Sequence, residues 1–178
     1  MPAGFEIPII IVGFGHSDDI VKCLNAIATQ RRCPEFEVFI CENGGPAAFD
    51  ALVKTLTEKG APCEGGVEPL ELASSEFVRA CRLRLAGGQA TVVIGEARDN
   101  FGYAGGINAW LRPLLAEPGW TAIWILNPDT WPEPDALAEL VEGGQQLQRA
   151  MCRAERGEAV RAGAVRLPAL VREDGDLA

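Results

Sequence analysis

Four short segments of this sequence carry the polar and glycine residues that suit nucleotide and metal binding. They are residues 13–17, 42–46, 98–106 and 127–130, and each follows an apolar, strand-like run. In an open parallel sheet, ligands bind beyond the carboxyl ends of the strands. We therefore expect the four segments to meet at one edge of a sheet and to form the functional site.

The second of these segments begins with Glu42 and Asn43, directly after the apolar run 36–41. A carboxylate there can accept hydrogen bonds from a base N–H or a ribose hydroxyl, while an amide both donates and accepts. The alternative is a simple turn, because Asn and Gly tolerate positive φ. Spacing alone leaves both interpretations open.

Phe14 lies in the segment after the first apolar run, within Gly13-Phe14-Gly15. The third glycine of a dinucleotide G-x-G-x-x-G motif would fall at Asp18, whose carboxylate would repel a pyrophosphate, so a nicotinamide or flavin fold is disfavoured. Phe14 is then either a core side chain or an aromatic ring that stacks on a nucleobase.

The third segment is rich in glycine and leads into a helix. Glycines permit a close backbone approach, and a helix start offers free N–H groups and a positive dipole end to an anion. This combination suits a diphosphate, although a tight strand-to-helix crossover would use the same residues. The candidate diphosphate-binding residues are Asn100, Gly102, Gly105 and Gly106.

Asn127-Pro128-Asp129 follows the fourth run. Pro128 fixes φ and makes the turn rigid, which presents Asp129 at a strand end. One carboxylate becomes an adequate Mg²⁺ or Mn²⁺ site when substrate phosphates and water supply the other oxygens. Alternatively, Asp129 and Thr130 only cap the next helix.

Length and composition restrict the class of protein. The 178 residues, with 48% hydrophobic residues and a net charge of −9, fit one folded domain over 1–178 and disfavour nucleic acid as a partner. The six cysteines contain no Cys-x-x-Cys pair, and the single His cannot complete a zinc set, so we expect reduced, structural cysteines. No secretory leader and no apolar run of about 20 residues is visible, which indicates a cytoplasmic protein without a transmembrane segment.

Strand and helix patterns alternate along the chain, which predicts one α/β domain with a mainly parallel sheet flanked by helices. The expected strands are 7–12, 36–41, 67–72, 91–94, 120–126 and 162–167. The expected helices are 17–30, 47–59, 75–85, the segment from the glycine-rich turn to 115, and 134–151, with an irregular connection over 60–75.

Taken together, the four segments resemble the family 2 glycosyltransferases, which have the Rossmann-like GT-A fold. Residues 11–20 are similar to that family's opening segment, with Phe14 at the aromatic position, and residues 39–45 to its V-V-D-N-G-S segment, with Glu42 in place of Asp. Residues 100–108 are close to N-x-G-F-A-G-G-x-N, and residues 126–130 match L-N-P-D-T, a form typical of the rhamnosyltransferase-like branch.

The resemblance implies transfer of a sugar from a nucleotide diphosphate donor to a hydroxyl acceptor with inversion, as in polysaccharide biosynthesis. Phe14, Glu42, Asn43 and Asn127 would join the glycine-rich loop in binding the nucleotide sugar, and Asp129 would bind Mg²⁺ or Mn²⁺. The acceptor would be a glycan or a lipid-linked sugar, which leaves room for peripheral membrane contact and for a dimer.

The family's catalytic base and acceptor-binding segment normally follow the strand expected near Leu167, and residues 172–178 do not match them. The resemblance therefore predicts a GT-A-type donor-binding part that is truncated at its C-terminus, with no catalytic base assigned. Two alternatives remain open: a nucleotide-sugar-binding module without catalysis, and an unrelated α/β nucleotide-binding protein.

Overall fold

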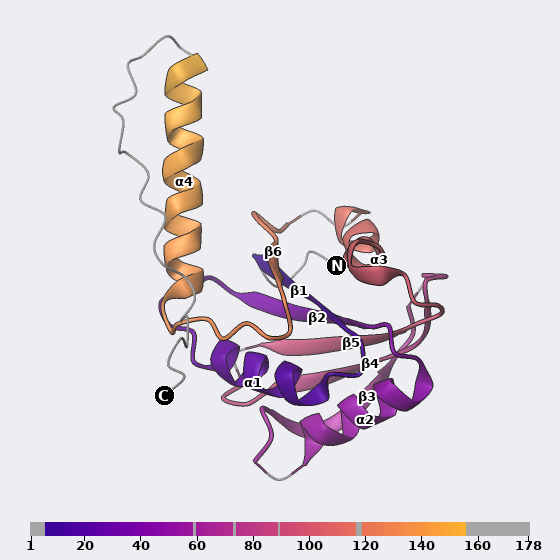
Figure 1. The fold of residues 1–178 in the computed structure, drawn as a ribbon. Helices are drawn as coiled ribbons and strands as arrows, with labels where there is room; N and C mark the ends of the chain where they lie inside the picture. The colour runs from indigo at the N-terminus through magenta and orange to yellow at the C-terminus, as the bar shows by residue number, and fades with distance from the viewer. Residues whose placement is uncertain (1–5, 59, 73, 89, 117–118, 156–178) are drawn as a thin grey trace, which may run out of the picture.

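The computed structural model describes residues 6–155, apart from 59, 73, 89 and 117–118, and shows an α/β fold (Figure 1). Six strands form one sheet in the order β3-β4-β5-β2-β1-β6, flanked by four helices. In chain order the elements are β1 (Ile7–Gly13), α1 (Ser17–Ala28), β2 (Phe36–Glu42), α2 (Pro46–Thr57), β3 (Cys63–Leu70), β4 (Phe77–Leu85), β5 (Thr91–Ala97), α3 (Gly102–Ala116), β6 (Trp124–Leu126) and α4 (Ala136–Glu155).

The sheet has a parallel half and an antiparallel half. Strands β5, β2, β1 and β6 run parallel to one another, whereas β3 and β4 are joined antiparallel at one side. Strands β1 and β2 lie in the middle, and every residue of both is buried. Burial on both faces explains their continuous β-branched and apolar composition.

The two faces of the sheet support separate cores. Ile9 and Ile11 of β1 face the core formed with α1 and α2, whereas Ile10 faces the core formed with α3. Alternation of side chains along a strand produces this division. Trp110 of α3 is the largest ring of the second core, and it packs against Phe39 and Phe77 with centroid separations of 5.2 and 4.3 Å.

The structure corrects the sequence-based prediction for residues 60–85. The helix predicted over 75–85 is strand β4, and the irregular connection predicted over 60–75 contains strand β3. In β4 the side chains of Cys81, Leu83 and Leu85 are buried, whereas Arg82 and Arg84 lie on the other face. This alternation is a strand signal, and completing the core against α2 outweighs the helix propensity of the individual residues.

Other boundaries differ by small amounts. Strand β6 covers only Trp124–Leu126 of the predicted 120–126, and α4 begins at Ala136 rather than at 134. The strand predicted over 162–167 lies outside the described residues. The five cysteines whose side chains the structure describes are free, as expected (Cys23, Cys33, Cys41, Cys63 and Cys81).

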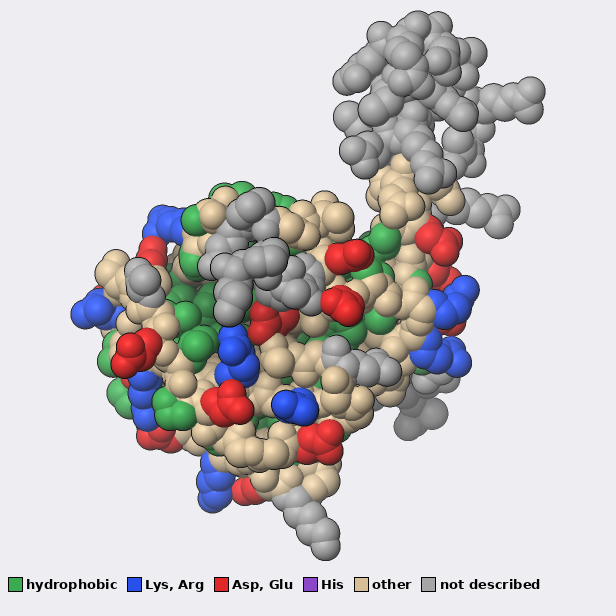
Figure 2. All heavy atoms as spheres, turned by 180° about the vertical axis from the view of Figure 1, so that it is seen from behind, with side chains coloured by type: hydrophobic (Ala, Val, Ile, Leu, Met, Phe, Trp, Pro, Cys, Tyr) green, Lys and Arg blue, Asp and Glu red, His purple; other side chains and the backbone are tan. Residues whose placement is uncertain are grey.

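The visible surface carries both acidic and basic side chains. On the face seen in Figure 2, acidic and basic side chains are interspersed over the described residues. Within the described part of the chain, no helix is both long enough and apolar enough to cross a membrane.

Gly95 of β5 gives a test of the α3 core. A Cβ atom at this position would lie 2.5 Å from Phe77 Cδ1 and 2.9 Å from Trp110 Cζ2. We expect Gly95→Ala to lower the free energy of unfolding by about 1–3 kcal/mol, because both rings must move. Gly66→Ala is the control, since no atom lies within 4 Å of its added Cβ. Urea unfolding of both variants measures the difference, and equal stability would contradict this packing.

Candidate active site

The sheet topology brings the four segments of interest to one edge. Glu42, the last residue of β2, is level with Gly13 of β1 and with Glu96 of β5, and Leu126 of β6 is level with Ile11. The strands are parallel, so the segments that follow them all leave from their carboxyl ends. The predicted convergence of the four segments is therefore confirmed.

Glu42 joins the segments after β1 and β2. Its carboxylate is fully buried, and Oε1 accepts hydrogen bonds from the backbone N–H of Gly15 (3.0 Å) and of Gly44 (2.7 Å). Oε2 is buried without a hydrogen-bond partner among the described residues. A Cβ at Gly13 would lie 2.8 Å from Oε2, so glycine is needed there for the carboxylate to fit.

Asn43 extends this connection to the segment after β5. Its backbone N–H donates to the carbonyl of Gly13 at 2.9 Å. Its side-chain Nδ2 donates to the carbonyl of Gly102 (3.2 Å), and Oδ1 accepts from the N–H of Phe101 (3.3 Å) and the Cys41 thiol (3.7 Å). Asn43 is almost fully buried, so its main contribution in this structure is to hold three segments in one arrangement.

The glycine-rich segment has structural reasons for its composition. Gly102 has φ of +65°, a conformation that favours glycine, and its N–H donates to Asn100 Oδ1 at 2.9 Å. Added Cβ atoms would lie 2.6 Å from Phe101 Cβ at Gly105 and 2.8 Å from Val12 Cγ1 at Gly106. The tight crossover thus explains the glycines, and it also brings the start of α3 close to the ends of β1 and β2.

Exposed aromatic rings lie in three of the four segments or directly beside them. The side chain of Phe14 is 56% exposed, which excludes the core interpretation. Tyr103 at the start of α3 and Trp131 after β6 are 49% and 39% exposed. The sequence reasoning considered only Phe14. Tyr103 and Trp131 could have been found from the sequence, because each is an aromatic residue directly beside a glycine-rich or Asn-Pro-Asp segment.

Asp129 is exposed and belongs to a turn that packs against α1. The turn is closed by the Thr130 N–H donating to the Asn127 carbonyl at 3.1 Å, and the buried Cys23 of α1 approaches that carbonyl with its sulfur at 4.0 Å. Burial, and then the negative charge of Asp129, raise the pKa of Cys23 to about 12. Lys22 directly precedes Cys23 in α1, and its Nζ lies 5.7 Å from the Trp131 ring centroid.

The described residues offer Asp129 no partner carboxylate for a complete metal site. No group of three or more His, Cys, Asp or Glu side chains capable of holding a metal occurs in the part of the chain that the structure describes. An exposed carboxylate with free oxygens nevertheless fits Mg²⁺ or Mn²⁺ if a diphosphate and water supply the remaining ligands. Metal binding by Asp129 stays a prediction.

The sequence reasoning missed a second buried carboxylate at this edge, Glu96 of β5. Glu96 is the register neighbour of Glu42 on the same face of the sheet, and Arg79 of β4 forms a hydrogen bond and an ion pair with it. The pair was not visible because residues 75–85 were expected to form a helix, which would not place Arg79 beside β5. A carboxylate at or next to the end of two strands, β2 and β5, was the signal.

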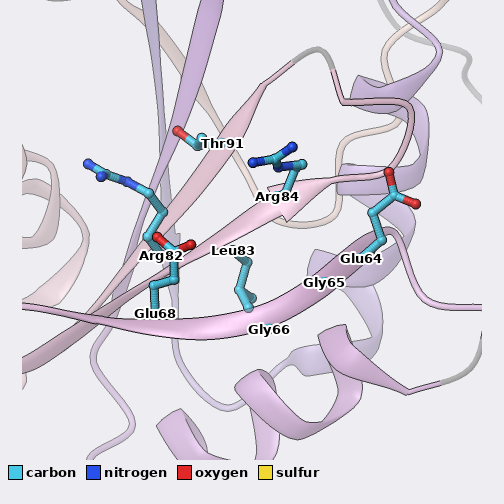
Figure 3. A pocket seen from close by; sticks show the side chains of 8 residues that line it. All are labelled: Glu64, Gly65, Gly66, Glu68, Arg82, Leu83, Arg84 and Thr91. Atoms are coloured by element: carbon cyan, nitrogen blue, oxygen red, sulfur yellow. The ribbon is translucent and has the colours of Figure 1, made fainter.

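A separate hollow of about 360 Å³ lies over strands β3, β4 and β5 (Figure 3). Its charged lining residues are Glu64, Glu68, Arg82 and Arg84, and none of the candidate residues contributes to it. Arg82 Nε lies 3.8 Å from a carboxylate oxygen of Glu37. The mixed charge of the lining favours neither an anion nor a cation, and we assign no ligand to this hollow.

Comparisons with known proteins give structural similarity only. No family model matches the sequence, and no curated protein matches it. The fold is similar to the crystal structure of S. aureus TarS, with a TM-score of 0.48 and 14% identity over 82% of this chain. A structure of TarS residues 1-349 gives a TM-score of 0.47 and 13% identity over 80% of this chain. This chain spans 20% and 33% of the two structures, and the similarity assigns no reaction to it.

Proposed function

We propose that the carboxyl edge of the parallel strands binds a nucleotide diphosphate sugar and that the chain is the donor-binding part of an inverting, metal-assisted glycosyltransferase. One observation carries the proposal. Glu42 and Asn43 join the segments after β1, β2 and β5 into one unit, and at its centre one buried carboxylate oxygen has no partner among the residues that the structure describes. A buried acceptor of this kind is costly unless a donor from a ligand completes it.

The nucleoside would lie between Phe14 and Glu42. An exposed ring next to buried polar groups suits an aromatic base, because the ring stacks on the base while the carboxylate accepts from a base N–H or a ribose hydroxyl. Asn43 would contribute by fixing the segments around the base. The resemblance to the rhamnosyltransferase-like branch favours dTDP-rhamnose as donor, with UDP- and GDP-sugars as alternatives.

The diphosphate would lie at the start of α3. Asn100, Gly102, Gly105 and Gly106 bring the first turn of this helix against the ends of β1 and β2, where its free N–H groups and its dipole favour an anion. The protein carries a net charge of −9, so a diphosphate near Asp129 requires a cation to offset the repulsion.

Asp129, presented by Asn127 and Pro128, would hold the metal. When bound, Mg²⁺ or Mn²⁺ supplies positive charge that stabilises the departing nucleoside diphosphate. Asp129 would orient the cation relative to the nucleotide, and the contacts of Asn127 and Trp131 with α1 hold the turn that carries its carboxylate. We also propose a cytoplasmic location and a glycan or lipid-linked acceptor.

A nucleotide-sugar-binding module without catalysis is the second candidate. The observation in its favour is that both candidate carboxylates of the site are already assigned, Glu42 to the nucleoside and Asp129 to the metal, which leaves neither as the base that deprotonates an acceptor. The two candidates predict the same binding and differ only in turnover.

Turnover of dTDP-rhamnose, UDP-glucose and GDP-mannose with Mn²⁺ tests the proposed function. We expect nucleoside diphosphate to be released from one of them, with water or an added sugar as acceptor, and release to fall sharply in Asp129→Ala. Binding of a nucleotide sugar without any release would support the binding module. Neither binding nor release with any of the three would contradict the proposal.

A further inference from the structure

Arg79, from strand β4, connects two parts of the candidate site without belonging to any of its four segments. Its Nε forms a hydrogen bond and an ion pair with Glu96 near the end of β5. A terminal nitrogen lies 2.7 Å from Asp50 Oδ1 in α2 and donates to the Pro46 carbonyl at 3.3 Å. The guanidinium also lies 4.4 Å from the ring centroid of Phe49. We refer to Arg79, Glu96, Asp50 and the Pro46 carbonyl as the Arg79 clamp.

The contacts of the clamp differ in strength. Asp50 and Arg79 are both well exposed, and exposed ion pairs contribute little. The side chain of Glu96 is only 4% exposed, so its charge depends on Arg79 for compensation. A buried charge that loses its partner stays uncompensated, and this costs much more free energy of unfolding than the loss of a surface ion pair. The contact between Arg79 and Glu96 therefore dominates.

The Arg79 clamp and Asn43 connect the same two parts of the site, the segment that follows β2 and the region around the end of β5. Pro46 is the last residue of segment 42–46 and the first of α2, and Glu96 lies two residues before segment 98–106, which contains Phe101 and Gly102. Asn43 connects the two parts through hydrogen bonds to the backbone of Phe101 and Gly102. A change in the spacing between the start of α2 and the end of β5 would therefore stretch those two hydrogen bonds.

We propose that Arg79 is a positioning residue for the nucleotide site, because it fixes the start of α2 to the end of β5 and so maintains the arrangement of Glu42, Asn43 and the glycine-rich segment. This inference rests on the proposed function. Arg79 acts through Glu96 and the Pro46 carbonyl, and it does not touch the nucleotide.

The test compares nucleotide affinity with stability in four variants. Arg79→Met removes the guanidinium, Arg79→Lys retains a charge without the planar fork, and Arg79→Met/Glu96→Gln removes both charges of the dominant pair. Arg84→Met is the matched control, because Arg84 lies on the same strand and its side chain makes no hydrogen bond or ion pair among the described residues. Titration calorimetry with UDP, GDP and dTDP plus Mn²⁺ gives Kd, and urea unfolding gives stability.

Arg79→Met is expected to lose stability and about 10- to 100-fold in nucleotide affinity, with partial recovery in Arg79→Lys. The double variant should recover stability, because no buried charge remains uncompensated, but it should not recover affinity. Arg84→Met should match the wild type in both measurements.

Two results would overturn the inference. One is an Arg79→Met variant that folds and binds nucleotide as tightly as the wild type. The other is a double variant that recovers affinity together with stability, which would make the role of Arg79 purely structural. If the wild-type protein binds none of the three nucleotides, the proposed function itself is contradicted and the inference falls with it.

Discussion

Glu42→Ala is expected to lower the free energy of unfolding by about 2–4 kcal/mol and to abolish nucleotide binding. The variant loses two hydrogen bonds from backbone N–H groups to a carboxylate, at Gly15 and Gly44, and each such charge-assisted bond is stronger than a neutral one. It also leaves an opening where a fully buried side chain was. The substitution also removes Oε2 of Glu42, a buried acceptor that has no hydrogen-bond partner among the described residues, and this removal offsets part of the lost stability.

Glu42→Gln separates the structural role of this residue from its proposed binding role. Its amide oxygen can still accept from both backbone N–H groups, so the loss of stability should be much smaller than in Glu42→Ala. The amide nitrogen replaces the proposed acceptor for the nucleoside, so nucleotide affinity should still fall strongly. Urea unfolding and titration of both variants provide the two measurements. If Glu42→Gln bound nucleotide as the wild type does, Glu42 would have only the structural role.

Asp129→Asn is expected to remove the Mn²⁺-dependent part of nucleotide affinity, with a loss of at least about 10- to 100-fold. The substitution keeps the size of the side chain but removes the negative charge that a divalent cation prefers. Stability should change little, because the Asp129 side chain is exposed and makes no hydrogen bond or ion pair within the described residues.

Glu68→Gln is the control for Asp129→Asn, since it removes an exposed carboxylate on β3, which is not one of the four parallel strands. Nucleotide titrations with and without Mn²⁺ should show a metal effect in this control and in the wild type. An equal metal effect in Asp129→Asn would show that another group binds the cation.

The parallel half of the sheet could be predicted because its strands have an unambiguous signal. Strands β1 and β2 are buried on both faces, so their sequences are almost entirely apolar, with Glu37 of β2 as an exception, and they end at Gly13 and Glu42. The same logic predicted that the segments after these strands meet at one edge of the sheet, and the register of Gly13, Glu42 and Glu96 confirms that they do.

The antiparallel half could not be predicted as readily. Strand β3 is an edge strand whose residues are mostly exposed and include two glycines and a proline, so it lacks an apolar run. Strand β4 alternates only over its second part, and Phe77 and Ala80 interrupt the period. Its strand state depends on pairing with β5, which is a tertiary contact that local sequence does not reveal.

In the candidate site, too, the sequence predicts where a residue lies but not which residues it contacts. Glu42 and Asn43 could be located at the sheet edge from sequence, but their burial and their bonds to neighbouring segments depend on the register of three strands. The sequence left two explanations for the glycines at 105 and 106, a diphosphate and a tight crossover, and contacts with Phe101 and Val12 show that the crossover requires them. Arg79 and Glu96 come together only because β4 pairs with β5.

Calorimetric titration of the wild-type protein with UDP, GDP and dTDP, each with and without Mn²⁺, tests the central claim most directly. The account predicts one-to-one binding of at least one nucleotide, tightened by Mn²⁺, with a preference that identifies the donor base. In a thermal unfolding experiment, the same nucleotide at about a hundredfold excess over Kd should add about 2.7 kcal/mol to the free energy of unfolding. Absence of binding by all three nucleotides, in a protein that unfolds cooperatively, would contradict the assignment of this edge as a nucleotide site.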